Sequence, residues 1–184
     1  IISNVLVTLF LNIRKESNKY NFTIASSFKH LNSMIIAHLG VGLLIIGITG
    51  SSVWQEEKIT RMKVNDEIMI SNYNVVFKEI NEVAGPNYLA LRGSFWIYNQ
   101  NNKIITVLTP ENRIYPITKN TISEVSIHTN LLRDLYIVLG DGDNDNGWVV
   151  RIYYNPLVVW IWIGVLVIII GGLSALKKNL NILR

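Results

Sequence analysis

The sequence predicts a membrane protein of mixed α and β structure, in which two full transmembrane helices flank an extracytoplasmic antiparallel β domain. Of its 184 residues, 49% are hydrophobic. These residues gather in three blocks, 1–13, 31–53 and 157–176, and the segment between the last two blocks is polar and rich in turn residues. The uneven distribution of apolar residues, rather than their total, therefore indicates a membrane protein.

The last block, 157–176, contains twenty residues without a charge, which is the length that a helix needs to cross a bilayer. The block 31–53 is similar, and its only ionisable residue is His38. The block 1–13 starts without Met inside an apolar run. As a helix it would cover about 20 Å of a hydrocarbon core of about 30 Å. We expect it to be the end of a truncated third transmembrane helix.

The distribution of charge predicts how the chain is oriented across the membrane. The segment 14–30 has four basic residues and one acidic residue, and the tail 177–184 has three basic residues, so each carries +3. The middle segment 54–156 has ten basic and twelve acidic residues, a net of −2. The positive-inside rule makes 14–30 a cytoplasmic loop and 177–184 a cytoplasmic tail, with 54–156 in the periplasm or an equivalent space. The net charge of +4 is thus an orientation signal, and we expect no nucleic-acid partner.

The last span also carries packing and interface signals. Gly164, Gly171 and Ala175 recur at helical spacing, and small residues on one face let helices approach closely. Trp160 and Trp162 lie at its outer end, where aromatic rings favour the headgroup region. We expect this helix to pack against other spans.

The middle segment reads as strands separated by turns. Runs rich in Val, Ile, Tyr, Phe and Trp predict strands at 64–70, 74–80, 88–98, 103–108, 122–128, 135–139 and 148–154. Clusters of Asn, Gly, Pro and Asp separate them, and helical periodicity is limited to a possible single helical turn near 130–134. Short strands at this spacing favour a small antiparallel barrel, for which an OB-like domain is our expectation.

The acidic stretch 140–147 resembles a calcium-binding loop in composition. It lacks the spacing and the closing Glu of an EF-hand, so we expect a surface turn. A weak calcium site formed by Asp141, Asp143 and Asp145 is the alternative. The absence of cysteine excludes disulfides, Cys-ligated zinc and iron–sulfur clusters within the chain.

Among the three histidines, His38 stands out because an ionisable group inside the hydrocarbon is costly and is usually functional. Its imidazole needs a hydrogen-bond partner or a metal, and haem iron is the usual metal held by single histidines from two transmembrane helices. A purely structural hydrogen bond to a neighbouring helix is the alternative. We expect His30 at the cytoplasmic edge to be solvated and His128 to be a surface residue.

No nucleophile–base pair, zinc-protease motif, phosphate loop or dinucleotide fingerprint occurs, so the sequence predicts no catalytic residue in this chain. Glu111 and Arg113 lie two residues apart on an extended segment and therefore point to the same side. We expect a structural ion pair there. The neighbours Arg133 and Asp134 invite the same interpretation.

These segments together resemble the CcmF-type haem lyases of cytochrome c maturation, over residues 34–173. The segments that carry the resemblance are AHLG (37–40), GPNY (85–88), PENRIY (110–115), SEVSI (123–127), RDLYIVLGD (133–141), WVVRIYYNPLVVWIWIG (148–164) and GGL (171–173). One departure is Ser123, where the family more often has Thr. The match covers only the C-terminal portion of the family's protein.

The resemblance implies a multi-pass membrane protein that takes haem from a periplasmic haem chaperone and supports its covalent attachment to apocytochrome c. It implies that His38 is an axial ligand of haem b, with the other ligand in an N-terminal portion outside this chain. Haem, lipid, that portion and other maturation proteins are the implied partners. The family's remaining haem-handling motifs lie upstream, so this chain alone is not expected to be catalytic.

The competing interpretation is a non-enzymatic membrane accessory or adaptor protein that carries an extracytoplasmic β domain and no haem. The two interpretations differ at His38, which only the first requires as a ligand. The bias toward Asn, Ile and Lys is typical of an AT-rich genome. We expect a bacterial inner membrane, with a mitochondrial inner membrane as the alternative.

Overall fold

The computed structural model describes residue 7 and residues 33–182, with side chains placed through residue 176 in the last helix. The predicted partial helix 1–13 and loop 14–30, as well as His30, lie outside the described residues, apart from Val7. The chain divides into a helical unit and a β unit, residues 51–156, each of which is compact by itself.

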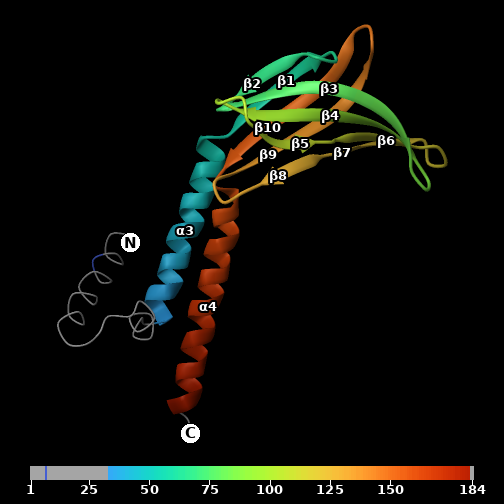
Figure 1. Cartoon of the computed structure of the whole chain (residues 1–184). Helices are drawn as coiled ribbons and strands as arrows, with labels where there is room; N and C mark the ends of the chain where they lie inside the picture. The colour runs from blue at the N-terminus through green and yellow to red at the C-terminus, as the bar shows by residue number, and fades with distance from the viewer. Residues whose placement is uncertain (1–6, 8–32, 183–184) are drawn as a thin grey trace. The chain divides into compact units, whose positions relative to one another are not determined.

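The helical unit contains α3 (Ser33–Val53) and α4 (Val158–Ile182) (Figure 1). Over 21 residues in α3 and 19 in α4, the helices are long and apolar enough to cross a membrane, by length and composition. Few polar side chains interrupt either apolar run. Because lipid offers no hydrogen-bond partners to the backbone, a helix, which pairs its own N–H and C=O groups, is the structure suited to it.

Glycines bring α3 and α4 into antiparallel backbone contact. A Cβ atom added to Gly164 would lie 2.6 Å from the backbone nitrogen of Leu44, and one added to Gly171 would lie 2.6 Å from that of Ala37. Such distances leave no room for a side chain. The predicted packing role of Gly164 and Gly171 is therefore confirmed, and their partner is α3.

The β unit has ten strands. In chain order they are β1 (Glu56–Met62), β2 (Glu67–Ile70), β3 (Tyr73–Ala84), β4 (Leu89–Asn99), β5 (Ile104–Leu108), β6 (Glu111–Tyr115), β7 (Asn120–Glu124), β8 (Ser126–Thr129), β9 (Arg133–Asp143) and β10 (Gly147–Pro156). One sheet has the order β1-β10-β9-β8, and the other has the order β2-β3-β4-β6-β7, with β5 also paired to β4. All pairings are antiparallel, as predicted.

The expected OB-like barrel is wrong, because the strands form two separate sheets rather than one closed sheet. The segment predicted as one strand at 122–128 shows the reason. It breaks at Val125 into β7 and β8, which belong to different sheets. A chain that changes sheet at this point builds a sandwich, in which two faces pack together instead of one sheet closing on itself.

The core lies between the inner faces of the two sheets. It is formed by the buried residues Met62, Ile70, Val75, Phe77, Phe95, Ile97, Leu108, Leu135, Ile137, Leu139, Trp148, Val150 and Ile152. Phe77 and Phe95 stack on neighbouring strands with ring centroids 4.5 Å apart. Gly93 makes space for them, since a Cβ atom there would lie 2.7 Å from the Phe95 ring.

Strands β5 and β6 pair with successive parts of the same edge of β4, and Thr109 and Pro110 lie between them. Proline has no N–H to give to a ladder and so suits the break between two strands. Its carbonyl oxygen still accepts a hydrogen bond from Gly93 N–H at 3.0 Å. The ladder resumes at once and places Glu111 directly opposite Arg92.

Candidate functional site

His38 lies in α3 with one ring nitrogen fixed and the other available. Its Nδ1 is 2.7 Å from the carbonyl oxygen of Met34, one helical turn earlier. A carbonyl oxygen only accepts, so Nδ1 must carry the proton and donate it. In the neutral imidazole the lone pair then resides on Nε2, the form in which histidine ligates metals.

The His38 side chain is exposed on the surface of the helical unit. It lies on an exposed stripe of α3 with Met34, Val41 and Ile45, whereas Gly40 is buried against α4. Nε2 is therefore accessible to a ligand or to a further helix that approaches this stripe. The contact with α4 and the stripe with His38 occupy different faces of the same helix.

His38 offers one nitrogen ligand, and it has no acidic or cysteine neighbour within the described helices α3 and α4. Among the described residues, no group of three or more His, Cys, Asp or Glu side chains is arranged to hold a metal ion. A site with a single protein ligand fits a metal whose other ligands come from a macrocycle and a second helix. It does not fit a four-ligand structural zinc site.

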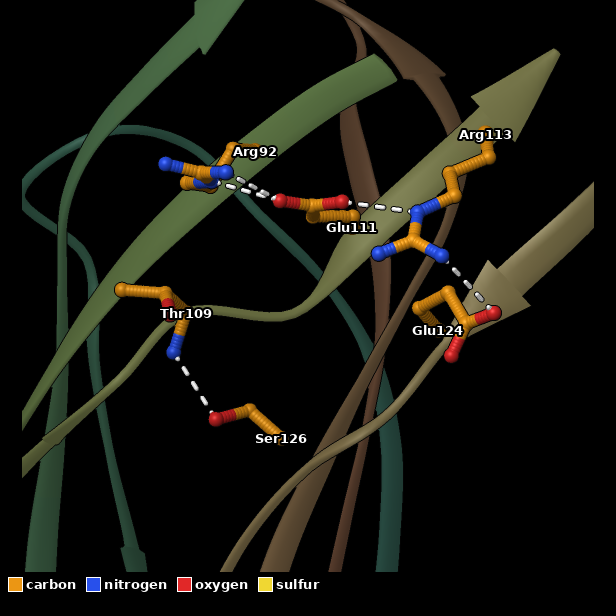
Figure 2. Close-up of polar contacts among 6 residues, drawn as sticks. All are labelled: Arg92, Thr109, Glu111, Arg113, Glu124 and Ser126. Carbon is orange, nitrogen blue, oxygen red and sulfur yellow. Dashed lines mark hydrogen bonds and ion pairs between the residues drawn. The ribbon is translucent and has the colours of Figure 1, made fainter. Parts of the chain in front are cut away.

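The PENRIY and SEVSI segments meet in a polar cluster centred on Glu111 (Figure 2). The Glu111 side chain is 8% exposed, and its Oε1 accepts a hydrogen bond from Arg92 Nε at 2.6 Å. Its Oε2 accepts one from Arg113 Nε at 2.8 Å. Arg113 also donates from Nη1 to Glu124 at 3.1 Å. The predicted structural ion pair between Glu111 and Arg113 is confirmed.

This Glu111 cluster joins β4, β6 and β7 across one sheet. Arg113 additionally lies over the Tyr88 ring, at 4.5 Å from its centroid. Close by, Thr109 N–H donates to Ser126 Oγ at 3.0 Å and so ties the β5–β6 connection to β8 of the other sheet. The role of these charges is accordingly structural, since both carboxylate oxygens of Glu111 already accept a hydrogen bond from an arginine.

Burial by itself raises the pKa of the Glu111 carboxyl, but the hydrogen bonds and positive charges of Arg113 and Arg92 outweigh it, and the net effect lowers the pKa below its ordinary 4.5. A carboxyl whose pKa is lower in the folded state than in the unfolded state stabilises the fold at pH values above its unfolded-state pKa. This stabilisation is lost as the pH falls through the folded-state pKa. Glu111 therefore contributes to acid sensitivity below about pH 4.5.

We expect Glu111→Gln to lower the free energy of unfolding of the β unit by about 2 kcal/mol at neutral pH, because it removes a charged hydrogen-bond acceptor that is buried. The cost is moderate because the Arg92 side chain is 44% exposed and can return to water. Thermal unfolding from pH 7 to below 4.5 should also show a weaker pH dependence. The exposed Glu79, changed to Gln, is the matched control. Equal pH profiles for the wild-type protein and Glu111→Gln would contradict the assignment.

The pair Arg133 and Asp134 does not form the predicted ion pair, because neighbours on a strand point to opposite faces. Arg133 is 2% exposed, lies 4.2 Å from the Tyr73 ring centroid and donates from Nη1 to His128 Nδ1 at 3.1 Å. Asp134 Oδ1 is buried without a hydrogen-bond partner. His128, predicted at the surface, is half-buried as the acceptor of Arg133.

The acidic segment 140–147 contains a turn, as predicted, but the turn spans fewer residues than expected. Strand β9 continues through Asp143 and β10 begins at Gly147. Asp143 Oδ1 accepts the backbone N–H groups of Asp145 and Asn146 at 2.9 and 2.6 Å. The Asn146 side chain and these N–H groups lower the pKa of the Asp143 carboxyl. Asp143 thus closes the hairpin, and Asp141 instead accepts from Asn112 at 2.9 Å.

Comparisons with known proteins agree on one family. The family model described as the CcmF C-terminal beta-sandwich matches residues 53–156. The chain is 37% identical over 143 residues to the cytochrome c-type biogenesis protein CcmF of Escherichia coli, and 36% identical over 140 residues to that of Haemophilus influenzae. These alignments cover 78% and 76% of this chain but only 22% of each relative.

A solved structure of the cytochrome c haem lyase CcmF has the same fold. It aligns with a TM-score of 0.58 at 14% identity and covers 92% of this chain and 28% of the solved one. This likeness concerns the fold alone. Because the family model matches more than half of the chain, the chain belongs to the CcmF family of cytochrome c-type biogenesis proteins and contains that family's C-terminal β-sandwich.

Proposed function

We propose that the chain is the C-terminal part of a cytochrome c haem lyase and that His38 is an axial ligand of haem b in its membrane domain. The observation that carries this proposal is the state of the imidazole. Met34 holds Nδ1 as a donor, and the His38 side chain, whose other nitrogen is Nε2, is exposed on a stripe of α3 that α4 does not cover. The second axial ligand comes from outside this chain.

Bound haem would supply an iron centre that exchanges single electrons. The residues of this chain contribute binding and orientation. His38 provides the nitrogen ligand, and the Met34 carbonyl fixes its tautomer and ring direction. The contact between Gly171 and Ala37 sets the position of the helical turn that carries His38.

The chain spans about a fifth of the length of these relatives, and in the complete protein this part acts with a preceding portion. We propose that the complete protein takes haem from a periplasmic haem chaperone and supports its attachment to apocytochrome c. Its location is a bacterial inner membrane, which it crosses several times. Supporting observations are the two apolar helices and the bacterial origin of the relatives.

The direct test is a visible spectrum of the chain purified after co-expression with the preceding part of a family protein. We expect a haem b spectrum that His38→Ala abolishes, because the iron loses a protein ligand. Ile45→Ala is the matched control, since Ile45 is 52% exposed on the same stripe and lies two turns away. A colourless wild-type complex, or an unchanged spectrum in His38→Ala, would favour the adaptor interpretation.

The β unit either supports the haem site or docks a partner. One candidate docking feature is a concavity of about 420 Å³ lined mainly by apolar residues of β3, β4 and β6, among them Leu89, Leu91 and Ile114. Replacing residues 54–156 by a short flexible linker that keeps both helices should abolish cytochrome c maturation in cells. The membrane level of the shortened protein must equal that of the wild type, and normal maturation at that level would refute this role.

A further inference from the structure

We propose that the β unit associates with a second copy of this chain, in a twofold arrangement that places the turn between β6 and β7 of each copy in an apolar hollow of the other. The turn comprises residues 116–119, and the hollow is the concavity lined by β3, β4 and β6. The inference concerns the β unit alone and uses no property of haem.

The hollow is an open apolar surface with a volume of about 420 Å³. Strand pairing aligns Ala84 with Leu89 and Leu89 with Ile114, so these three apolar side chains share one face of the sheet. Leu89 is 58% exposed and Ile114 is 46% exposed, because the core of the sandwich does not extend over them. A hollow of this size and lining can receive a large apolar side chain.

The β6–β7 turn presents one such side chain on a constrained backbone. Ile117 is 90% exposed, so its own β unit hardly covers it. Pro116 precedes it and restricts the backbone. The Lys119 N–H donates to the Tyr115 carbonyl oxygen at 2.8 Å, which closes the turn. Because the turn is already ordered, little conformational entropy is lost when Ile117 enters a hollow.

Charge selects the occupant of the hollow. Glu82 is the charged residue of its lining, and this exposed carboxylate has no ion-pair partner among the described residues. The turn supplies the matching cation, because Lys119 follows Ile117 by two residues. Lys119 is also exposed, and it too is unpaired within the part of the chain that the structure describes. An apolar side chain beside a lysine thus matches an apolar hollow beside a glutamate.

The turn and the hollow lie side by side at the same end of the β unit (Figure 1). Tyr88, in the β3–β4 turn directly before Leu89, has its ring centroid 5.6 Å from that of Tyr115, which ends β6 directly before the β6–β7 turn. A surface with a protrusion beside a hollow is complementary to a copy of itself after a rotation of 180°. Each copy then fills the hollow of the other, and the assembly closes at two chains.

Single cysteines test the contact, because the chain contains none. Ala84→Cys lies in the hollow and Thr118→Cys lies in the turn, and both leave Ile117 and Glu82 in place. We expect oxidation of membranes that contain both single variants to give a disulfide-linked pair of chains that requires both cysteines. Ile59→Cys is the matched control for Thr118→Cys, because Ile59 is 57% exposed on β1, at the edge of the other sheet.

Charge reversal tests the recognition. Glu82→Lys and Lys119→Glu should each weaken the dimer at least about tenfold, measured by sedimentation equilibrium of the full chain in detergent. The double variant should recover to within about threefold of the wild type, because the ion pair forms again with its charges exchanged. Glu79→Lys is the matched control, since Glu79 is exposed on the opposite face of β3. Thermal unfolding in nanodiscs that hold one chain, where Ile117 stays exposed, checks that the β unit of each variant is intact.

A chain that sediments as a monomer at every concentration would overturn the proposal. So would a double charge variant that associates no better than either single variant, since charge would then not select the partner. A ladder of oligomers from a chain that carries both cysteines would exclude the twofold arrangement. A disulfide between Ala84→Cys and a different protein would assign the hollow to that partner instead.

Discussion

Gly171→Leu is expected to push α3 and α4 apart at the level of His38 and to remove most of the haem b absorbance of the co-expressed complex. A Cβ atom at Gly171 would lie 2.6 Å from Ala37 N and 3.0 Å from Ala37 Cα. These are backbone atoms, so no side-chain rotation can relieve the overlap. Overpacking of this kind costs about 1–3 kcal/mol, and here it acts on the turn next to the ligand.

Gly172 provides a control one residue away, because a Cβ atom there meets nothing within 4 Å. Gly172→Leu should leave both the spectrum and the helix contact unchanged. Spin labels at one position in each helix would measure the separation by electron paramagnetic resonance. An unchanged separation in Gly171→Leu would show that the glycine contact does not set the distance between the helices.

Phe95→Ala is expected to lower the free energy of unfolding of the β unit by about 3–5 kcal/mol. Phe95 is fully buried and stacks on Phe77, so its removal loses apolar burial and leaves a cavity between the sheets. For a unit of this size, the melting temperature should fall by about 15 °C or more.

Near-ultraviolet circular dichroism of the chain in nanodiscs would follow this unfolding. Ile117→Ala is the control, since Ile117 is 90% exposed and should change the stability by no more than about 0.5 kcal/mol. A loss below about 1 kcal/mol for Phe95→Ala would mean that the ring stack is not a central part of the core.

Hydrophobic patterning predicted the helices and most strands, because burial on one face leaves a periodic trace in the sequence and an apolar environment on all faces leaves a continuous apolar run. Strand β1 was missed because it is a charged edge strand, EEKITRM, with mostly exposed residues. Strand β6 was missed because its Glu, Asn and Arg side chains serve the Glu111 cluster rather than the core. Polar strands of this kind owe their structure to partners distant in sequence.

The same limit applies to the sites. Alternation along a strand predicted that Glu111 and Arg113 point to the same side. The second arginine, Arg92, is 19 residues away from Glu111, and only the pairing of β4 with β6 brings it there. The partnership of Arg133 with Tyr73 and His128 was not predictable, because it depends on how strands from both sheets meet. His38 was identified from its cost in lipid, whereas its tautomer required the distance to Met34.

The pairing of β1 with β10 changes how the connection between the two helices should be regarded. A flexible chain of about a hundred residues would impose an entropic cost on bringing its ends together. Once folded, this insertion presents Glu56 opposite Tyr154. For the helices it is then equivalent to a tight turn, and the effective concentration of α4 at α3 is set by whether the sandwich is folded. Events that loosen β1 from β10 would therefore weaken the association of the two helices without altering a single residue inside the bilayer.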